Sequence, residues 1–352
     1  SGTLSTTPEL SFVFGTTGLF WVNFVPIAGA GNFNGDMNGE TPIDDIVVAT
    51  PQNNTVYVIP GNVNWGLAPL EIDLEDPADQ AASMVVEITR TSGGASNWFG
   101  MSVGAGGNVL PDAGETQYDD LVISQYGGPS AAYVIPGRAL SGGVALTISP
   151  ELDGAGSEDA VSVRLRPQGN DQNKDWFFGQ ILGGEDLDCD GIPELIGVHL
   201  QAALSDGRSI YVFNGDFVAG GVGTTLYIGI IEPAGSAFVS PNGTIIKGNY
   251  QSIGLLGNFD DSQIQPECSG DLVYGDFNGL SFFGSVYVRH NLSGVYGMAS
   301  FQEVDQTIQD PFTPGNLDFG GIRIAPLSDF DGDGYPDMMV GTNGSGYMTL
   351  IR

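Results

Sequence analysis

The chain has 352 residues, of which 41% are hydrophobic, and carries 42 acidic against 10 basic side chains, for a formal net charge of -32. So acidic a surface excludes nucleic acid and anionic membranes as partners, because neither would find enough Lys or Arg to bind. The hydrophobic share argues against a disordered acidic chain, and no apolar run approaches the roughly 18 residues of a membrane span, so we expect no direct membrane insertion.

Turn residues divide the chain into many short apolar segments. There are 54 glycines and 20 prolines, and Val, Ile, Tyr and Phe recur in short runs between them. This pattern is typical of short β-strands. An isolated apolar strand is expected first, at Glu9–Gly15, and the one stretch expected to be helical is Asp79–Ile88. The chain is therefore predicted to be all-β.

An acidic residue followed by an apolar strand recurs five times, at intervals of 75, 74, 77 and 66 residues. A second strand follows each copy, as in "NTVYVIPG", "SAAYVIPG" and "RSIYVFNG". Most copies are preceded by an aromatic-glycine pair, ending at Gly100, Gly179 and Gly321. The five acidic residues are Asp45, Asp120, Glu194, Asp271 and Asp337. Such regular self-similarity indicates a repeat architecture.

A repeat of this length, with about four strands, fits the blades of a β-propeller better than the coils of a solenoid. We therefore predict a single all-β domain over residues 1–352, a propeller of about five four-stranded blades, with a count of six or seven left open. The last repeat shows three recognisable strands. We expect Glu9–Gly15 to complete it and close the ring, which would remove exposed sheet edges.

The fifth repeat contains "DFDGDGYPD", with acidic groups at positions 1, 3, 5 and 9 and glycine at position 6. A tight loop of this kind folds oxygen ligands around Ca²⁺, whereas Mg²⁺ demands a stricter geometry and no soft ligand favours a transition metal. An EF-hand is excluded, because position 9 already begins a strand. The expected ligands are Asp329, Asp331, Asp333, Asp337 and the carbonyl oxygen of Tyr335.

The other repeats keep this pattern to different degrees. The third repeat is complete, with Asp186, Asp188, Asp190, Glu194 and the carbonyl oxygen of Ile192. The remaining candidates are Asn32, Asn34, Asp36 and Asp45 in the first repeat, Asn258, Asp260, Ser262 and Asp271 in the fourth, and Asn108, Asp112 and Asp120 in the second. We therefore expect Ca²⁺ as the cofactor, at two strong sites and up to five in all.

The aromatic-glycine pair, the DxDxDGxxD loop, the apolar strand and the "VYV" strand together resemble the FG-GAP repeats of the integrin α-subunit β-propeller. The resemblance runs from about Phe14 to Arg352 and is specific in the third and fifth repeats. It implies calcium loops on one face of the propeller, each between two strands of a blade. The family usually has seven shorter blades, so this chain departs from it in number and length.

Catalytic patterns are weak in this sequence. "GMSVG", at Gly100–Gly104, matches the GxSxG motif but leads into no helix, and His199 and His290 stand in or beside expected strands. We therefore predict a non-enzymatic propeller serving as an adhesion, recognition or structural assembly module. Two alternatives stay open: a lectin, with Trp65 as a candidate contact, and a calcium-dependent polysaccharide lyase or hydrolase, for which Arg164, Arg166 and Lys174 form a small basic cluster.

Charge also bears on the setting of the protein. Five bound Ca²⁺ ions would reduce the net charge from -32 to -22, so calcium alone does not offset the acidity. We expect a secreted or cell-surface protein in a saline or calcium-rich environment, with a protein or glycan partner, alone or in a larger assembly. Cys189 and Cys268 could form one disulfide. Trp98 and Trp176 recur in phase with the repeat and are expected to pack between blades.

Overall fold

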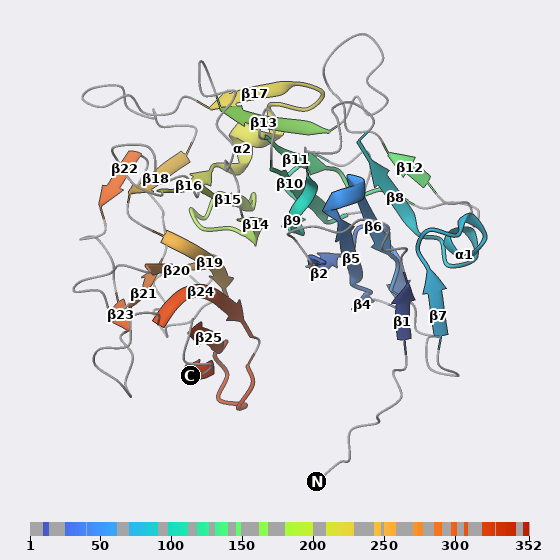
Figure 1. The fold of residues 1–352 in the computed structure, drawn as a ribbon. Coiled ribbons are helices and arrows are strands. Elements are labelled where there is room, and N and C mark those ends of the chain that lie inside the picture. The colour runs from blue at the N-terminus through green and yellow to red at the C-terminus, as the bar shows by residue number, and fades with distance from the viewer. Residues whose placement is uncertain are drawn as a thin grey trace.

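The computed structural model describes residues 10–13, 25–39, 41–61, 70–90, 98–111, 118–126, 131–139, 146–148, 162–167, 180–199, 209–228, 243–247, 250–257, 270–276, 285–290, 297–300, 306–308, 319–327, 329–342 and 348–351. These residues form an all-β protein, as predicted (Figure 1). Helical structure in them is limited to α1 (Pro77–Ala82), α2 (Gly215–Ala219) and a 3-10 turn at Pro51–Asn53. Neither described α-helix is long and apolar enough to cross a membrane.

Five sheets follow one another along the chain, and within each sheet successive strands pair antiparallel. The first contains β2 (Ile27–Gly31), β5 (Asp45–Thr50), β6 (Thr55–Ile59) and β8 (Val86–Thr89). The second contains β9 (Phe99–Gly107), β10 (Asp120–Gln125), β11 (Ala131–Ile135) and β13 (Val163–Pro167). The third contains β14 (Gln180–Glu185), β15 (Glu194–His199), β16 (Ser209–Phe213) and β18 (Gly243–Lys247). The fourth contains β19 (Tyr250–Leu256), β20 (Asp271–Asp276), β21 (Ser285–His290) and β23 (Gln306–Ile308), and the last contains β24 (Phe319–Pro326), β25 (Met338–Thr342) and β26 (Met348–Ile351).

Further strands come from the connections between the third and fourth strands of a repeat. β12 (Leu146–Ile148), β17 (Thr225–Ile228) and β22 (Gly297–Ser300) each pair in parallel with the outermost strand of the preceding sheet. In the first repeat, the corresponding strand is β7 (Leu70–Asp73), which pairs in parallel with β1 (Leu10–Val13). A short hairpin of β3 (Met37–Asn38) and β4 (Thr41–Pro42) forms the insertion before Asp45.

Most second and third strands of these sheets read as continuous apolar runs because both of their faces are covered. In β6 every residue of "TVYVI" is buried, and in β10 every residue of "DLVISQ" is buried. Continuous burial is expected for strands sandwiched between layers, whereas a solvated sheet would alternate apolar and polar residues. The sequence pattern therefore already indicates sheets that are covered on both faces.

The same two faces meet at each contact between successive sheets. We call the face of a sheet that meets the next sheet its forward face, and the face that meets the preceding sheet its rear face. The forward face of the first sheet packs against the rear face of the second, and the residues are Val47, Ala49, Val56 and Val58 on one side and Leu121, Ile123, Tyr133 and Ile135 on the other. Equivalent cores join the second sheet to the third, the third to the fourth and the fourth to the last.

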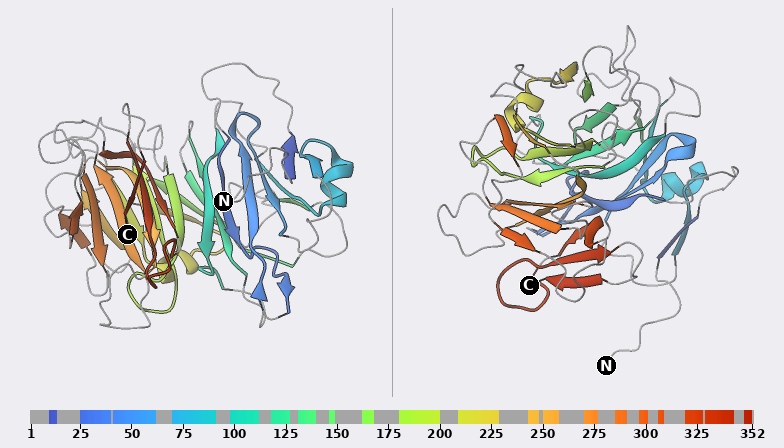
Figure 2. Two further views of the ribbon diagram at one scale, coloured as in Figure 1. Left: turned by 90° about the horizontal axis from the view of Figure 1, so that it is seen from below. Right: turned by 60° about the vertical axis from the view of Figure 1, so that its left-hand side comes forward.

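The first strands of the five sheets, β2, β9, β14, β19 and β24, lie next to one another in that order. The sheets therefore follow each other around a common axis, as blades do in a β-propeller (Figures 1 and 2). The first and last sheets lie apart, and the described strands do not close a ring.

The N-terminal strand pairs with a strand that was not predicted. β1 pairs in parallel with β7, with Leu10 opposite Leu70, because the connection between β6 and β8 contains an apolar strand, Leu70–Asp73, which offers β1 an edge. The described part of the last sheet has three strands, so its completion by Glu9–Gly15 stays a prediction.

The predicted helix at Asp79–Ile88 is half right. Helix α1 begins after Asp76, whose side chain accepts a hydrogen bond from the Ala78 N–H, and it ends at Ala82. Met84 then adopts a positive φ of 53°, and Val86 begins β8. The short helix α2, capped by Asn214, was not predicted.

Candidate metal centres

The third acidic loop joins β14 to β15 and is folded by its own aspartates. The Asp186 carboxylate accepts hydrogen bonds from the N–H groups of Cys189 (2.7 Å) and Gly191 (2.9 Å). Asp188 accepts one from the Asp190 N–H (3.1 Å), and Asp190 accepts one from the Ile192 N–H (2.9 Å). These bonds wrap the backbone around the carboxylates, with Gly191 at a positive φ of 91°.

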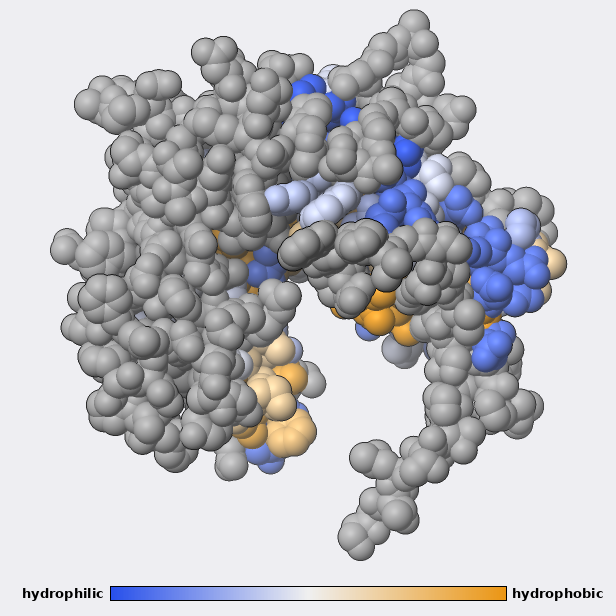
Figure 3. Space-filling view, viewed as in Figure 1, coloured by the Kyte–Doolittle hydropathy of each residue, from blue (hydrophilic) through white to orange (hydrophobic). Residues whose placement is uncertain are grey.

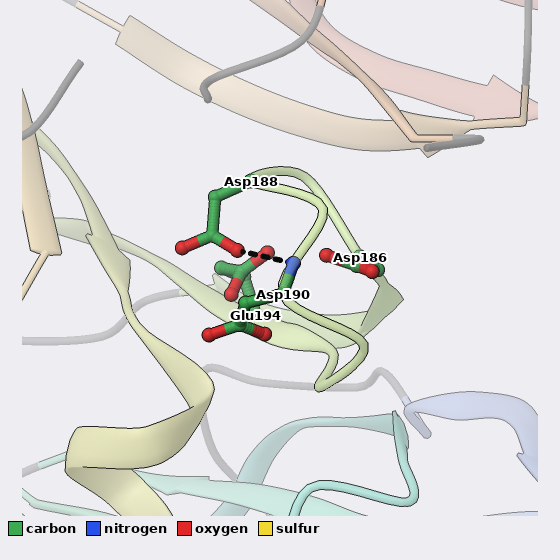
Figure 4. A group of neighbouring side chains, drawn as sticks. All are labelled: Asp186, Asp188, Asp190 and Glu194. Carbon is green, nitrogen blue, oxygen red and sulfur yellow. Dashed lines mark hydrogen bonds between the residues drawn. The ribbon is translucent and has the colours of Figure 1, made fainter. Parts of the chain in front are cut away.

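Four carboxylates of this loop converge. Asp186, Asp188, Asp190 and Glu194 each offer an oxygen, and these oxygens all lie within 4.8 Å of one another (Figure 4). Four of the five expected ligands of the third repeat are therefore brought together. Ile192 contributes its N–H to the loop, and the role expected of its carbonyl oxygen stays a prediction.

The electrostatics of this cluster favour a cation. The pKa of Glu194 is raised to about 8, mainly by burial and also by the charges of Asp188 and Asp186, which together outweigh the lowering effect of its backbone hydrogen bonds. Burial and the charge of Asp190 also raise the pKa of Asp188, whose carboxylate accepts a hydrogen bond from Asn214 Nδ2 (2.9 Å). Gathering several carboxylates away from water is costly unless an ion of opposite charge offsets it.

The fifth loop has the same local structure but is exposed. Oxygens of Asp329, Asp331 and Asp333 lie within 4.8 Å of one another. Asp329 accepts hydrogen bonds from the Gly332 N–H (2.6 Å) and the Gly334 N–H (2.9 Å), and the Tyr335 N–H donates to Asp333 (2.9 Å). The structure therefore brings together three of the five residues expected here, and the carbonyl role of Tyr335 stays a prediction.

Asp337 lies outside that group. It is buried just before β25, and its carboxylate accepts a hydrogen bond from the Phe330 N–H (2.7 Å). The equivalent Glu194 has one more methylene group, and its carboxylate reaches both the acidic cluster and the Leu187 N–H.

In the first loop, two buried oxygens lack a donor. The Asp36 N–H donates to Asn34 Oδ1 (2.7 Å), and Asn34 Nδ2 donates to Asp36 Oδ2 (3.2 Å). Asn32 Oδ1 and Asp36 Oδ1 are buried and accept no hydrogen bond from the described residues, and Asn32 is only 5% exposed. A buried acceptor without a partner costs about 1–3 kcal/mol, so each one calls for an explanation such as an ion.

Two loops lie mostly outside the described residues. Asp112 of the second repeat, and Asn258, Asp260 and Ser262 of the fourth, are not among them. Their strand-start residues, Asp120 and Asp271, are described and buried.

The strand-start acids have a role that the sequence analysis did not assign to them. All five of these residues, Asp45, Asp120, Glu194, Asp271 and Asp337, are buried. The carboxylates of Asp45, Asp120, Glu194 and Asp337 accept hydrogen bonds from described backbone N–H groups. Asp120 binds three, from Val109 (2.9 Å), Leu110 (2.6 Å) and Gly137 (3.2 Å). Asp45 likewise binds the N–H groups of Asn34 and Gly61, and burial raises its pKa to about 7. In the first three repeats these carboxylates fasten the loop to the end of the third strand. The expected role of the five acids as metal ligands stays a prediction.

Three glycines complete this arrangement and were missed. Gly61, Gly137 and Gly215 follow the third strand of the first three repeats and donate to the strand-start acid. A Cβ at each would collide with the carbonyl oxygen of the residue before that acid, which is Asp44, Asp119 or Pro193. The recurrence of glycine in "IPG", "IPG" and "FNG" is the signal that could have found them.

The loops also touch the next sheet. The Asn32 N–H donates to Asp119 Oδ2 (2.7 Å), the Asp119 N–H donates to the Asn32 carbonyl (3.1 Å), and the Arg138 N–H donates to the Phe33 carbonyl (2.8 Å). In the third loop, the side chain of Leu187 approaches Gly270, which lies just before β20 of the fourth sheet. An ion held in such a loop would therefore stabilise the contact between two sheets.

Cys189 lies in the third acidic loop and is disulfide-bonded. The only other cysteine of the chain is Cys268, which is outside the described residues.

The structure also places several of the catalytic and sugar-binding candidates. "GMSVG" runs through the continuous strand β9 rather than a strand-to-helix elbow, and Ser102 Oγ donates to the Ile181 carbonyl (3.3 Å). His199 and His290 end β15 and β21. Arg164 is buried, with its guanidinium 5.8 Å from the centre of the Tyr133 ring. Trp65, Lys174 and Trp176 lie outside the described residues.

Comparison with known proteins adds little. No family model and no curated protein matches this sequence. One solved structure to which the chain is similar is a crystal structure of BBS1N in complex with ARL6DN, at 12% identity and a TM-score of 0.33, covering 92% of this chain and 77% of that chain. At this TM-score the likeness carries no argument, so the fold and the site rest on the strands and loops themselves.

Proposed function

We propose that this protein is a calcium-stabilised β-propeller of FG-GAP type that serves as an extracellular adhesion, recognition or structural assembly module and not as an enzyme. The five sheets are its blades, and the N-terminal strand closes the ring. The observation that carries the proposal is the oxygen-rich loop found at the same place in the first, third and fifth sheets, most completely at Asp186, Asp188, Asp190 and Glu194.

Calcium suits these loops because their donors are carboxylate and amide oxygens. Ca²⁺ accepts six to eight such ligands in flexible geometry, and the described loops offer no imidazole nitrogen. The unpartnered oxygens of Asn32 and Asp36 support the same ion in the first loop, where the cluster has only one carboxylate besides Asp45. Bound there, the ion would offset negative charge and hold a loop against the next sheet.

An extracellular setting is supported by charge and by the disulfide at Cys189. Disulfides persist in oxidising compartments and are rare in the cytosol. A net charge of -32 is best tolerated in saline, calcium-rich surroundings. We therefore propose that the partner is a protein or glycan at an extracellular surface.

A lectin is the second candidate. Trp98 stacks on Tyr126 with ring centroids 5.1 Å apart, and both side chains are partly exposed. Aromatic rings of this kind offer apolar faces on which a sugar ring could stack.

The test compares binding with and without calcium. Protein dialysed against millimolar calcium is analysed for metal content and then applied to glycan and extracellular-protein arrays, with and without chelator. A double variant, Asp186→Asn with Asp190→Asn, is compared with Glu71→Gln and Glu75→Gln, which remove the same charge at exposed positions outside the loops.

We expect bound calcium and an array signal that falls with chelator and in the loop variant but not in the control. Glycan signals alone would favour the lectin. Absence of calcium from the wild-type protein would refute the metal part of the proposal, and turnover of an acidic polysaccharide would refute the non-enzymatic part.

A further inference from the structure

The last sheet presents a forward face that nothing among the described residues covers. Met348 is 73% exposed, whereas the residues at the same position of the four preceding sheets are fully buried; these are Val56, Ala132, Ile210 and Val286. Phe330, the second residue of its acidic loop, is 70% exposed, whereas Phe33, Val109 and Leu187 are at most 2% exposed. In the preceding sheets these positions are covered by the sheet that follows.

The first sheet has the complementary defect on its rear face. Ile46 is 37% exposed, whereas its equivalents in the other sheets are fully buried; these are Leu121, Leu195, Leu272 and Met338. Ile27 is 64% exposed, whereas Val103, Ile181, Ile253 and Ile324 are at most 8% exposed. The outer part of this face is already covered, because Ile72, Leu74 and Val85 pack on Tyr57 and Ile59. Only the inner positions of this face, Ile27 and Ile46, are left exposed.

Strand β1 indicates the position of the sheet that would cover the rear face of the first sheet. In the next three repeats, the connecting strand pairs in parallel with the outermost strand of the preceding sheet, as β12 does with β8. β7 is the connecting strand of the first repeat, since it begins eleven residues after β6 ends, just as β12 begins eleven residues after β11 ends. Its parallel partner is β1, which therefore occupies the place of the outermost strand of a sheet that precedes the first.

We propose that the last sheet of the same chain is that sheet, so that its forward face packs on Ile27 and Ile46 and β26 pairs antiparallel with β1. This inference rests on the propeller part of the proposed function and is independent of calcium. It names both surfaces of the closing contact, which the general prediction of closure did not.

The register of the new pair follows from the first sheet. There Val58 lies opposite Val86, and Val86 lies beside Leu146 of the connecting strand. Leu10 lies beside Leu70, which is the equivalent of Leu146, and Leu350 is the equivalent of Val58. The expected antiparallel pairs are therefore Leu10 with Leu350, Ser11 with Thr349, and Phe12 with Met348.

The same chain is a better occupant than a second copy. Two segments of one chain meet without the loss of translational and rotational freedom that two separate molecules incur. A second copy whose first sheet docked on this last sheet would continue around the same axis, and its later sheets would run into the first copy. The hollow between the first and last sheets is also lined by hydrophobic residues on both sides (Figure 3).

A disulfide cross-link tests the contact. Residues directly opposite each other in an antiparallel pair have Cβ atoms about 4.5–5.5 Å apart, close to the span of a disulfide. The variant Ser11→Cys with Thr349→Cys is oxidised in calcium and in chelator, and its linked peptides and mass are measured. Leu10→Cys with Thr349→Cys is the matched control, because neighbouring residues of a strand point to opposite faces.

We expect a monomer with the Ser11–Thr349 link in both conditions, at a yield at least severalfold above the control. No link above the control, or a link formed only between two chains, would overturn the proposal. Because the cross-link does not require an ion, it can form even if the protein binds no calcium, so the two proposals fail separately.

Discussion

Replacing Asp120 by Ala removes the acceptor of three backbone hydrogen bonds in one step. Asp120 is fully buried and receives the N–H groups of Val109, Leu110 and Gly137. Each buried donor left without a partner costs about 1–3 kcal/mol, so loss of all three should lower the free energy of unfolding by roughly 3–9 kcal/mol. That is a large part of the ~5–15 kcal/mol typical of a folded protein.

The assay is urea unfolding at neutral pH in chelator, so that no metal contributes, with the free energy obtained by linear extrapolation. Asp44→Ala is the matched control, because this aspartate is exposed, and it should change stability by less than about 0.5 kcal/mol. Asp120→Asn keeps one acceptor oxygen, so its loss of stability should lie between those of Asp120→Ala and Asp44→Ala. This variant keeps the test possible if Asp120→Ala does not fold. A loss below about 1 kcal/mol for Asp120→Ala would refute the role assigned to these carboxylates.

Three further predictions concern other parts of the fold. Phe330→Ala should cost about 3–5 kcal/mol in urea unfolding if the ring closes over this side chain, and a cost below about 0.5 kcal/mol would place Phe330 in water. Gly137→Ala forces a Cβ against the Asp119 carbonyl and should lower the melting temperature by several degrees. Gly29→Ala is the control, because a Cβ there meets open space, and it should not lower the melting temperature. Equal effects of the two variants would contradict the close contact between Gly137 and Asp119. Burial raises the pKa of Glu194 from 4.5 to about 8, so the folded protein holds this proton more tightly than the unfolded chain, and stability in chelator should fall as pH rises through that interval, by up to about 1.4 kcal/mol per unit. The measurement is urea unfolding at several pH values. Glu194→Gln should weaken the dependence of stability on pH, whereas the exposed-site control Glu75→Gln should not. Equal pH dependence in the two variants would contradict the raised pKa of Glu194.

The repeat and its loops could be predicted from sequence because both are local. Strands such as Thr55–Ile59 are continuous apolar runs, and the spacing of Asp186, Asp188 and Asp190 alone places their oxygens together. The role of the acidic residue that precedes the second strand was harder to predict. Asp337 has the same spacing whether it binds an ion or the Phe330 N–H, and only the three-dimensional position of its carboxylate decides between them.

The connecting strands could not be predicted, because each pairs with a different sheet from its own repeat. Leu146–Ile148 has three residues and no pattern of its own, and it becomes a strand by pairing with Val86–Ile88 of the preceding sheet. The same holds for Leu70–Asp73, and this is why its pairing with the N-terminal strand was not predicted. The helix predicted at Asp79–Ile88 is half right for a different reason, since Val86–Thr89 becomes a strand by pairing with β6 of its own sheet.

The most direct test of the account is the free energy of unfolding measured as a function of free calcium concentration. If the acidic loops hold calcium between sheets, stability should rise above the dissociation constant by about 1.4 kcal/mol per tenfold increase in calcium for each ion bound only by the folded protein. We predict a slope that corresponds to at least two calcium ions. The double variant Asp186→Asn with Asp190→Asn should have a smaller slope, and magnesium at the same concentrations should not produce the same rise in stability. A stability that does not change with calcium would contradict the account.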